Sequence, residues 1–176
     1  MTFQRILRAR EVCALLGTTT KDGTFPYPTL NGLIKRGIIL PVAGGDGTGD
    51  HRCFQFAPDV LSLVVGRGLR GKGYSESVAA GVMDRIREYE ADTLAEMFAQ
   101  GRSYLMIFGD EVAPRFSTQT EVNEIWHEHL PDSPADWFRQ RPAAINVKLL
   151  SDKLLALLDG MKRKEVVSAE PTEVVA

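Results

Sequence analysis

The spacing of hydrophobic residues indicates two helices near the start of the chain. Apolar residues recur at three- and four-residue intervals in "AREVCALLG" (residues 9–17) and in "TLNGLIKRG" (residues 29–37), and each stretch ends at a glycine. Both features are typical of short amphipathic helices. Residues 18–27 between them are rich in turn-forming residues and are predicted to be a loop. The rest of the N-terminal part is arranged around the second helix.

Extended patterns surround these two helices. Residues 51–56 alternate between polar and apolar positions, and a Gly- and Asp-rich tip separates them from the apolar stretch 38–42. These two stretches are therefore predicted to form a β-hairpin. Residues 3–8 also alternate, which predicts a short strand or an ordered arm. A third helix is expected over residues 58–65, where a series of glycines ends the pattern.

One long helix is predicted over residues 75–101. Ser75 is a favourable N-cap, and apolar residues follow it at three- to four-residue spacing, without a regular heptad pattern. The residues of this apolar stripe are Val78, Val82, Ile86, Tyr89, Leu94, Met97 and Phe98.

The last third of the chain is predicted to form a small α+β domain. Residues 103–112 and 113–118 are typical of two strands around a Gly-Asp turn, and residues 142–150 are typical of a further strand. A short helix and a Pro-rich loop lie between the second and third of these strands. A helix is expected over residues 151–162, with Ser151 as its N-cap.

The predicted fold class is therefore α+β, in four consecutive parts. These are an N-terminal helix-and-hairpin module over residues 1–75, a linking helix over residues 76–101, a small α+β domain over residues 102–163, and a disordered tail over residues 164–176.

Charge is distributed unevenly along the chain. Residues 1–75 contain ten Lys or Arg and five Asp or Glu, whereas the remainder contains eleven and eighteen, so the whole chain has a net charge of −2. This asymmetry fits a module that binds a polyanion, and it fits equally well an ordinary variation of charge along a soluble chain. No signal peptide or membrane-spanning segment is predicted. Cys13 and Cys53 lie at predicted helix and strand positions, which favours a reduced cytoplasmic setting.

The order helix, loop, helix, hairpin, helix is that of a winged helix-turn-helix. The stretches "LRAREVCALLG", "TLNGLIKRGIILP", "GGDGTGDHRCFQF" and "DVLSLVVGRGLRGKGYS" also resemble the N-terminal DNA-binding domain of MerR-type regulators, over roughly residues 7–82. The resemblance implies a recognition helix in the DNA major groove and a hairpin wing on the DNA backbone. It also implies a homodimer through residues 76–101, although this helix could instead pack on its own C-terminal domain.

The resemblance assigns DNA contacts to several basic residues. Arg52 corresponds to the wing arginine that contacts phosphate, and a planar guanidinium can bind two phosphate oxygens at once. His51 could contact phosphate when protonated, and an exposed histidine without a role is the preferred interpretation. Lys35 and Arg36 would lie beside phosphates. Arg36 is equally suited to the negative end of the helix dipole.

The recognition helix and the loop before it depart from the MerR-type pattern. Thr29 and Asn31 occupy exposed turns and are the candidates for base contacts, because asparagine can form two hydrogen bonds with adenine. Asn31 and Gly32 replace the Arg-aromatic pair that normally follows the Thr-Leu dipeptide. The preceding loop is longer than usual. Lys21 within it could reach a further phosphate, but a solvated insertion is the preferred interpretation.

The sequence predicts a DNA-binding protein and no enzyme, cofactor or metal site. His127 and His129 lie beside Glu124 and Glu128, but no third ligand follows at a suitable spacing, so a surface cluster is preferred to a zinc site. The first hypothesis is a MerR-like transcriptional regulator that binds double-stranded DNA, with a homodimer slightly preferred. The alternatives are a phage or plasmid protein that organises DNA for excision, partition or packaging, and a winged-helix module that binds proteins.

Overall fold

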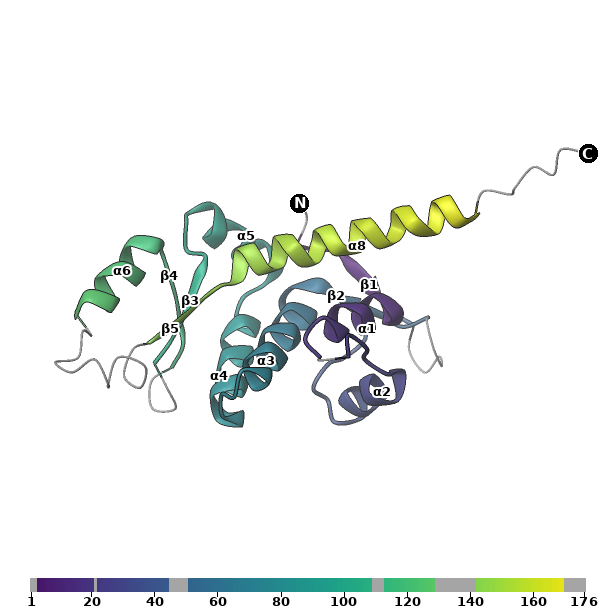
Figure 1. Cartoon of the computed structure of the whole chain (residues 1–176), viewed down its shortest axis with the longest axis horizontal. Helices are drawn as coiled ribbons and strands as arrows, with labels where there is room; N and C mark the ends of the chain where they lie inside the picture. Colours follow the sequence, from purple (N-terminus) through teal and green to yellow (C-terminus); the bar gives the residue numbers. More distant parts are fainter. Residues whose placement is uncertain (1–2, 21, 45–50, 109–112, 129–141, 170–176) are drawn as a thin grey trace, which may run out of the picture.

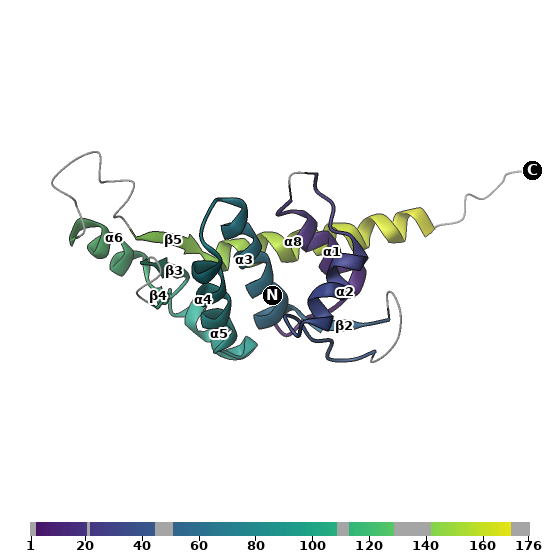
Figure 2. The ribbon, with the colours of Figure 1, turned by 90° about the horizontal axis from the view of Figure 1, so that it is seen from below.

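Two small antiparallel sheets lie at opposite ends of a group of helices in the computed structural model (Figure 1). One further helix, α8, runs from the three-stranded sheet past α3 towards the N-terminal sheet, as both views show (Figure 2). The structure describes residues 3–20, 22–44, 51–108, 113–128 and 142–169. The fold class is α+β, as the sequence predicts. Within the described residues, no helix combines the length and the hydrophobicity that spanning a membrane requires.

The N-terminal sheet brings together two segments that are distant in sequence. Strand β1 (Ile6–Arg8) pairs antiparallel with β2 (Cys53–Gln55), and the facing residues Leu7 and Phe54 are both fully buried. Of the two alternatives for residues 3–8, a short strand or an ordered arm, the structure has the strand. Helix α1 (Ala9–Gly17) has the predicted bounds, and α2 (Tyr27–Lys35) begins two residues before the predicted Thr29.

The predicted hairpin is present only as a single bridge. Cys53 pairs with Ala43 through hydrogen bonds from Val42 N to Cys53 O (2.8 Å) and from Cys53 N to Ala43 O (2.9 Å), and the structure has no strand over residues 38–42. Pro41 contributes to this difference, because proline has no N–H to donate to a ladder. The residues of the hairpin tip, 45–50, lie outside the described residues.

The third helix is longer than the glycines predict. Helix α3 (Leu61–Gly71) follows a π-type segment over Phe56–Val60 and continues through Gly66. A Cβ atom on Gly66 would lie 2.4 Å from Sδ of Met83 in the next helix, α4 (Glu76–Arg87). Glycine therefore leaves room for the side chain of Met83 against α3 instead of ending α3.

The single helix expected over residues 75–101 is corrected to two helices. Ser75 caps α4, since its Oγ accepts a hydrogen bond from Val78 N at 3.2 Å, but α4 ends at Arg87 and α5 (Ala91–Ala99) begins after an extended residue, Glu90. The change of direction allows edge-to-face contacts among aromatic rings. Their centroids are 5.7 Å apart for Tyr89–Phe116, 6.1 Å for Phe98–Phe116 and 5.3 Å for Phe3–Phe98.

The C-terminal sheet has the strand order β4-β3-β5, with β3 (Tyr104–Ile107) in the centre. The flanking strands β4 (Arg115–Ser117) and β5 (Ala143–Asn146) both pair antiparallel with it, and α6 (Gln119–Glu128) follows β4. The predicted strands are confirmed, although the turn at residues 109–112 lies outside the described residues.

Helix α8 (Val147–Ala169) is longer than predicted at both ends. Its N-cap is Asn146, whose Oδ1 accepts a hydrogen bond from Leu149 N at 2.8 Å. Ser151 is fully buried inside the helix, so its prediction as the N-cap is wrong. The helix also continues through residues 164–169, which were predicted to be part of a disordered tail.

One hydrophobic core connects the N-terminal and C-terminal parts. Three buried residues of α8, Leu154, Leu155 and Leu158, belong to the same cluster as the buried residues of β1, α1 and α2. The predicted units 1–75 and 102–163 thus share a core. Val82, Ile86 and Leu94 of the expected dimer stripe are also fully buried in this core within one chain.

Candidate nucleic-acid interface

Helix α2 presents an exposed face opposite its buried stripe. Leu30 and Leu33 are buried in the core, and a rotation of about 100° per residue places Pro28, Gly32 and Lys35 near the centre of the opposite face. Pro28 and Lys35 are exposed, and no atom lies within 4 Å of the position that a Cβ on Gly32 would occupy. Packing does not require this glycine, and its effect is to leave a gap between Pro28 and Lys35 on the exposed face.

Thr29 and Asn31 flank this face on opposite sides. Thr29 is exposed and Asn31 is half-buried, in the first two turns of α2. Both predicted base-contacting residues are therefore at the surface. Only Asn31 has a described partner from another part of the chain.

The structure joins Asn31 to Arg52, two residues that the sequence suggested for separate roles. The Nη2 group of Arg52 donates a hydrogen bond to Oδ1 of Asn31. Arg52 itself is half-buried, and its main-chain oxygen accepts a hydrogen bond from Ala9 N at 3.1 Å. The guanidinium thus fixes the carboxamide of Asn31 with its oxygen towards Arg52, and two donor hydrogens of Asn31 Nδ2 remain for other partners.

The other predicted residues differ in how they are held. Lys35 and His51 are exposed. Arg36 is also exposed, but its Nε donates to the main-chain oxygen of Gly32 at 3.2 Å, which is the contact expected of a cation at a helix C-terminus. Lys21 lies outside the described residues.

The long loop before α2 is mostly exposed, as its interpretation as a solvated insertion implies, but it is also anchored to the core. Phe25 is buried, and the guanidinium carbon of Arg67 lies 4.4 Å from the centroid of its ring. The Nε of Arg67 also donates to Oγ1 of Thr19 at 3.4 Å, and burial lowers the pKa of Arg67. A Cβ on Gly17 would lie 2.6 Å from the main-chain oxygen of Gly23, so the loop packs directly on the end of α1.

Arg87 supports the turn that follows α2. Its Nη2 donates to the main-chain oxygen of Ile38 at 2.6 Å, from the last residue of α4. Asp59 is half-buried close to this arginine: burial raises the pKa of its carboxyl group, and the charge of Arg87 opposes that shift. Sequence analysis missed both Arg67 and Arg87, because their partners are main-chain atoms or residues of distant elements.

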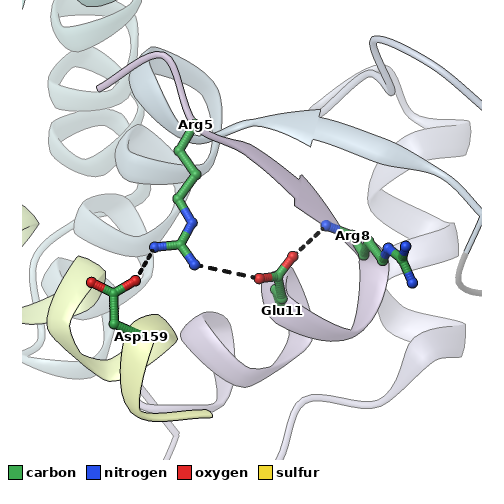
Figure 3. A network of polar contacts seen from close by, with 4 residues as sticks. All are labelled: Arg5, Arg8, Glu11 and Asp159. Carbon is green, nitrogen blue, oxygen red and sulfur yellow. Dashed lines mark hydrogen bonds and ion pairs between the residues drawn. The ribbon is translucent and has the colours of Figure 1, made fainter. Parts of the chain in front are cut away.

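A third arginine links the N-terminal part to α8. Figure 3 shows Arg5 between two carboxylates, with Nη1 at 2.7 Å from Oδ1 of Asp159 and Nη2 at 3.7 Å from Oε1 of Glu11. The other oxygen of Glu11 accepts a hydrogen bond from Arg8 N at 2.8 Å and so caps α1. The network therefore connects the start of α1, the strand before it and the C-terminal helix.

The sequence drew attention to two histidines of the C-terminal part, His127 and His129. Among the described residues, no three His, Cys, Asp or Glu side chains come together as a metal site would require. His127 is exposed at the end of α6, and His129 lies outside the described ranges. Trp126 donates from Nε1 to the main-chain oxygen of Pro142 at 2.9 Å.

The fold and the α2 surface define an α+β protein with a helix–loop–helix at its N-terminus. No family model matches the chain, and neither does any curated protein or solved structure. The MerR-type resemblance consequently rests on the sequence motifs alone, and its functional content is a proposal.

Proposed function

We propose that this protein binds double-stranded DNA through α2 and Arg52, as a MerR-like transcriptional regulator. The observation that carries the proposal is the Arg52–Asn31 pair at the side of the exposed face of α2. A cation suited to phosphate and an amide suited to adenine lie together there, and the two groups act on adjacent parts of a duplex.

The shape and charge of the same surface support the proposal. The major groove of B-DNA admits an α-helix, and the centre of the exposed face of α2 carries only Pro28, Gly32 and Lys35. Lys35 and Arg36 add positive charge at the end of the helix. The excess of basic residues in the N-terminal part gives a further attraction to a polyanion.

The proposal does not require a dimer through residues 76–101. The apolar stripe that suggested such a dimer is covered by the chain itself, because Val82, Ile86 and Leu94 are fully buried. A homodimer would need another surface, and it remains a proposal that sedimentation can test.

The experiment begins with selection of bound duplexes from a random pool by the full chain. Affinities for a selected and a random duplex are then measured by fluorescence anisotropy at several salt concentrations. Asn31→Ala should cost about 1–3 kcal/mol on the selected duplex and little on the random one. Lys35→Ala should weaken both equally and reduce the salt slope by about one. Lys153→Ala on α8 removes an exposed positive charge away from this surface and is the matched control.

The results separate the hypotheses. Wild-type protein that binds no duplex at low salt would refute DNA binding and favour a protein-interaction module. Equal losses for Asn31→Ala on both duplexes would show that Asn31 does not contact base edges. Binding would then rest on shape and charge, as expected of a protein that organises DNA.

A further inference from the structure

A cavity of about 340 Å³ lies where α3 meets β5 and the start of α8. Three parts of the chain form its walls: the turn after α1, the second half of α3 with the turn that follows, and the β5–α8 junction. The two ribbon views agree that the start of α8 lies beside α3 (Figures 1 and 2). The cavity lies outside the proposed DNA surface, since none of the residues suggested for DNA contact lines it.

Most of the wall is apolar. Val64, Val65 and Leu69 of α3 face Ile145 and Leu150 from the other side of the cavity. A volume of this size is at the lower end of the range of small-molecule sites, about 300–1,000 Å³, and such sites are mainly lined by hydrophobic side chains with a few polar groups. The size and lining therefore suit a compact apolar body of two or three rings.

The described residues of the cavity wall carry one formal charge, and that charge is positive. Among them, Lys72 is the only ionisable acid or base apart from the phenol of Tyr74, and none is Asp or Glu. Lys72 is exposed and makes no ion pair within the described part of the chain. The half-buried Tyr74 adds a hydroxyl group that can donate a hydrogen bond.

We propose that this cavity binds a small molecule with an apolar, ring-containing body and one anionic group, such as an aromatic carboxylate. The body would lie against the apolar wall, and Lys72 would be the counter-ion, with Tyr74 as a hydrogen-bond donor to the anion. A cationic ligand of the same size would have no partner for its charge on this wall. The inference concerns a second site and is independent of the DNA-binding proposal.

The charge preference can be tested with two fluorescent probes of similar shape on the full chain. 8-Anilinonaphthalene-1-sulfonate carries an anion, and N-phenyl-1-naphthylamine has the same ring framework without it. Lys72→Gln should weaken binding of the sulfonate about three- to fivefold, as for a partly exposed ion pair, and leave the neutral probe unchanged. Lys162→Gln removes another exposed lysine, on α8, and should change neither affinity.

The location can be tested by filling the cavity. Gly68 lines it, and a Cβ at this helical position would have no atom within 4 Å, so Gly68→Leu places a side chain into the cavity without a backbone clash. This variant should lose binding of both probes without a fall in its melting temperature. Gly160→Leu, at another helical glycine with open space around its Cβ, is the control and should bind both probes normally.

Three outcomes would overturn the proposal: no saturable binding to the wild-type protein, equal weakening of both probes by Lys72→Gln, or undiminished binding by folded Gly68→Leu. The Lys72→Gln variant alters only an exposed side chain. It therefore decides the charge preference even if Gly68→Leu fails to fold.

Discussion

Replacing Arg5 by methionine should destabilise the protein mainly through the carboxylate that it leaves behind. The side chain of Glu11 is only 11 % exposed, and Arg5 is its charged partner in the network of Figure 3. Methionine keeps an unbranched apolar side chain in place of the arginine stem, so the substitution removes charge with a limited change of packing. Glu11 would keep the hydrogen bond from Arg8 N and lose its counter-ion.

The expected magnitudes follow from the exposure of each partner. Removing one partner of a buried ion pair costs about 3–5 kcal/mol, and the remaining backbone donor reduces this to about 2–3 kcal/mol for Arg5→Met. Asp159 is 53 % exposed, so Asp159→Asn should cost at most about 1 kcal/mol even though its contact, 2.7 Å, is the shorter one. The Arg5–Glu11 contact should thus contribute more to stability than the shorter Arg5–Asp159 contact, because the carboxylate of Glu11 is more buried.

A double variant tests the mechanism directly. Glu11→Gln keeps an oxygen for Arg8 N but has no charge, so Arg5→Met combined with Glu11→Gln should be more stable than Arg5→Met alone, by about 1–2 kcal/mol. Urea unfolding of the wild type, Arg5→Met, Asp159→Asn and the double variant gives their free energies of unfolding. Unchanged m-values would confirm that these can be compared as two-state transitions. A double variant no more stable than Arg5→Met would refute the orphaned charge as the cause. So would an Asp159→Asn variant as unstable as Arg5→Met.

Two further predictions concern the helices that follow the N-terminal module. Gly66→Ala should lower the melting temperature, because its Cβ would lie 2.4 Å from Met83 Sδ, whereas Gly68→Ala has open space and should stabilise α3 by up to about 1 kcal/mol. Thermal unfolding of the two variants gives the comparison, and equal shifts would contradict it. Ile86→Ala should cost about 2–5 kcal/mol at any protein concentration, since Ile86 is fully buried within one chain. A loss that depended on protein concentration in denaturation and sedimentation would indicate a dimer interface instead.

Local signals in the sequence identify the short elements but not all of their partners. The apolar spacing and final glycine of residues 9–17 were sufficient for α1, because both are properties of the helix itself. An alternating pattern shows that residues 51–56 are extended, but it does not specify which segment they pair with. The predicted partner, residues 38–42, is the nearest extended segment in sequence. In the structure β2 pairs with β1, which is much further away in sequence.

The break between α4 and α5 has only a weak signal in the sequence. The apolar stripe takes a five-residue step from Tyr89 to Leu94, where its preceding steps are three or four residues, but neither glycine nor proline interrupts residues 88–90. Long-range aromatic contacts, including that of Tyr89 with Phe116, accompany the change of direction, and a single-sequence pattern does not contain them. The same limit explains why Arg67 and Arg87 were missed at the candidate site.

The pairing of Asn31 with Arg52 restricts how either residue can contact DNA. The Nη2 of Arg52 is engaged by Asn31, and its Nε is buried without a hydrogen-bond partner among the described residues. Both hydrogens of Nη1 and one of Nη2 are left for a phosphate, so a phosphate and Asn31 would share one guanidinium. A lysine could supply a positive charge for the phosphate but not the fork that also orients Asn31. Arg52→Lys should therefore retain most of the affinity for random duplex while it weakens binding to the selected one, whereas a residue that only contacts phosphate would leave the ratio of the two affinities unchanged.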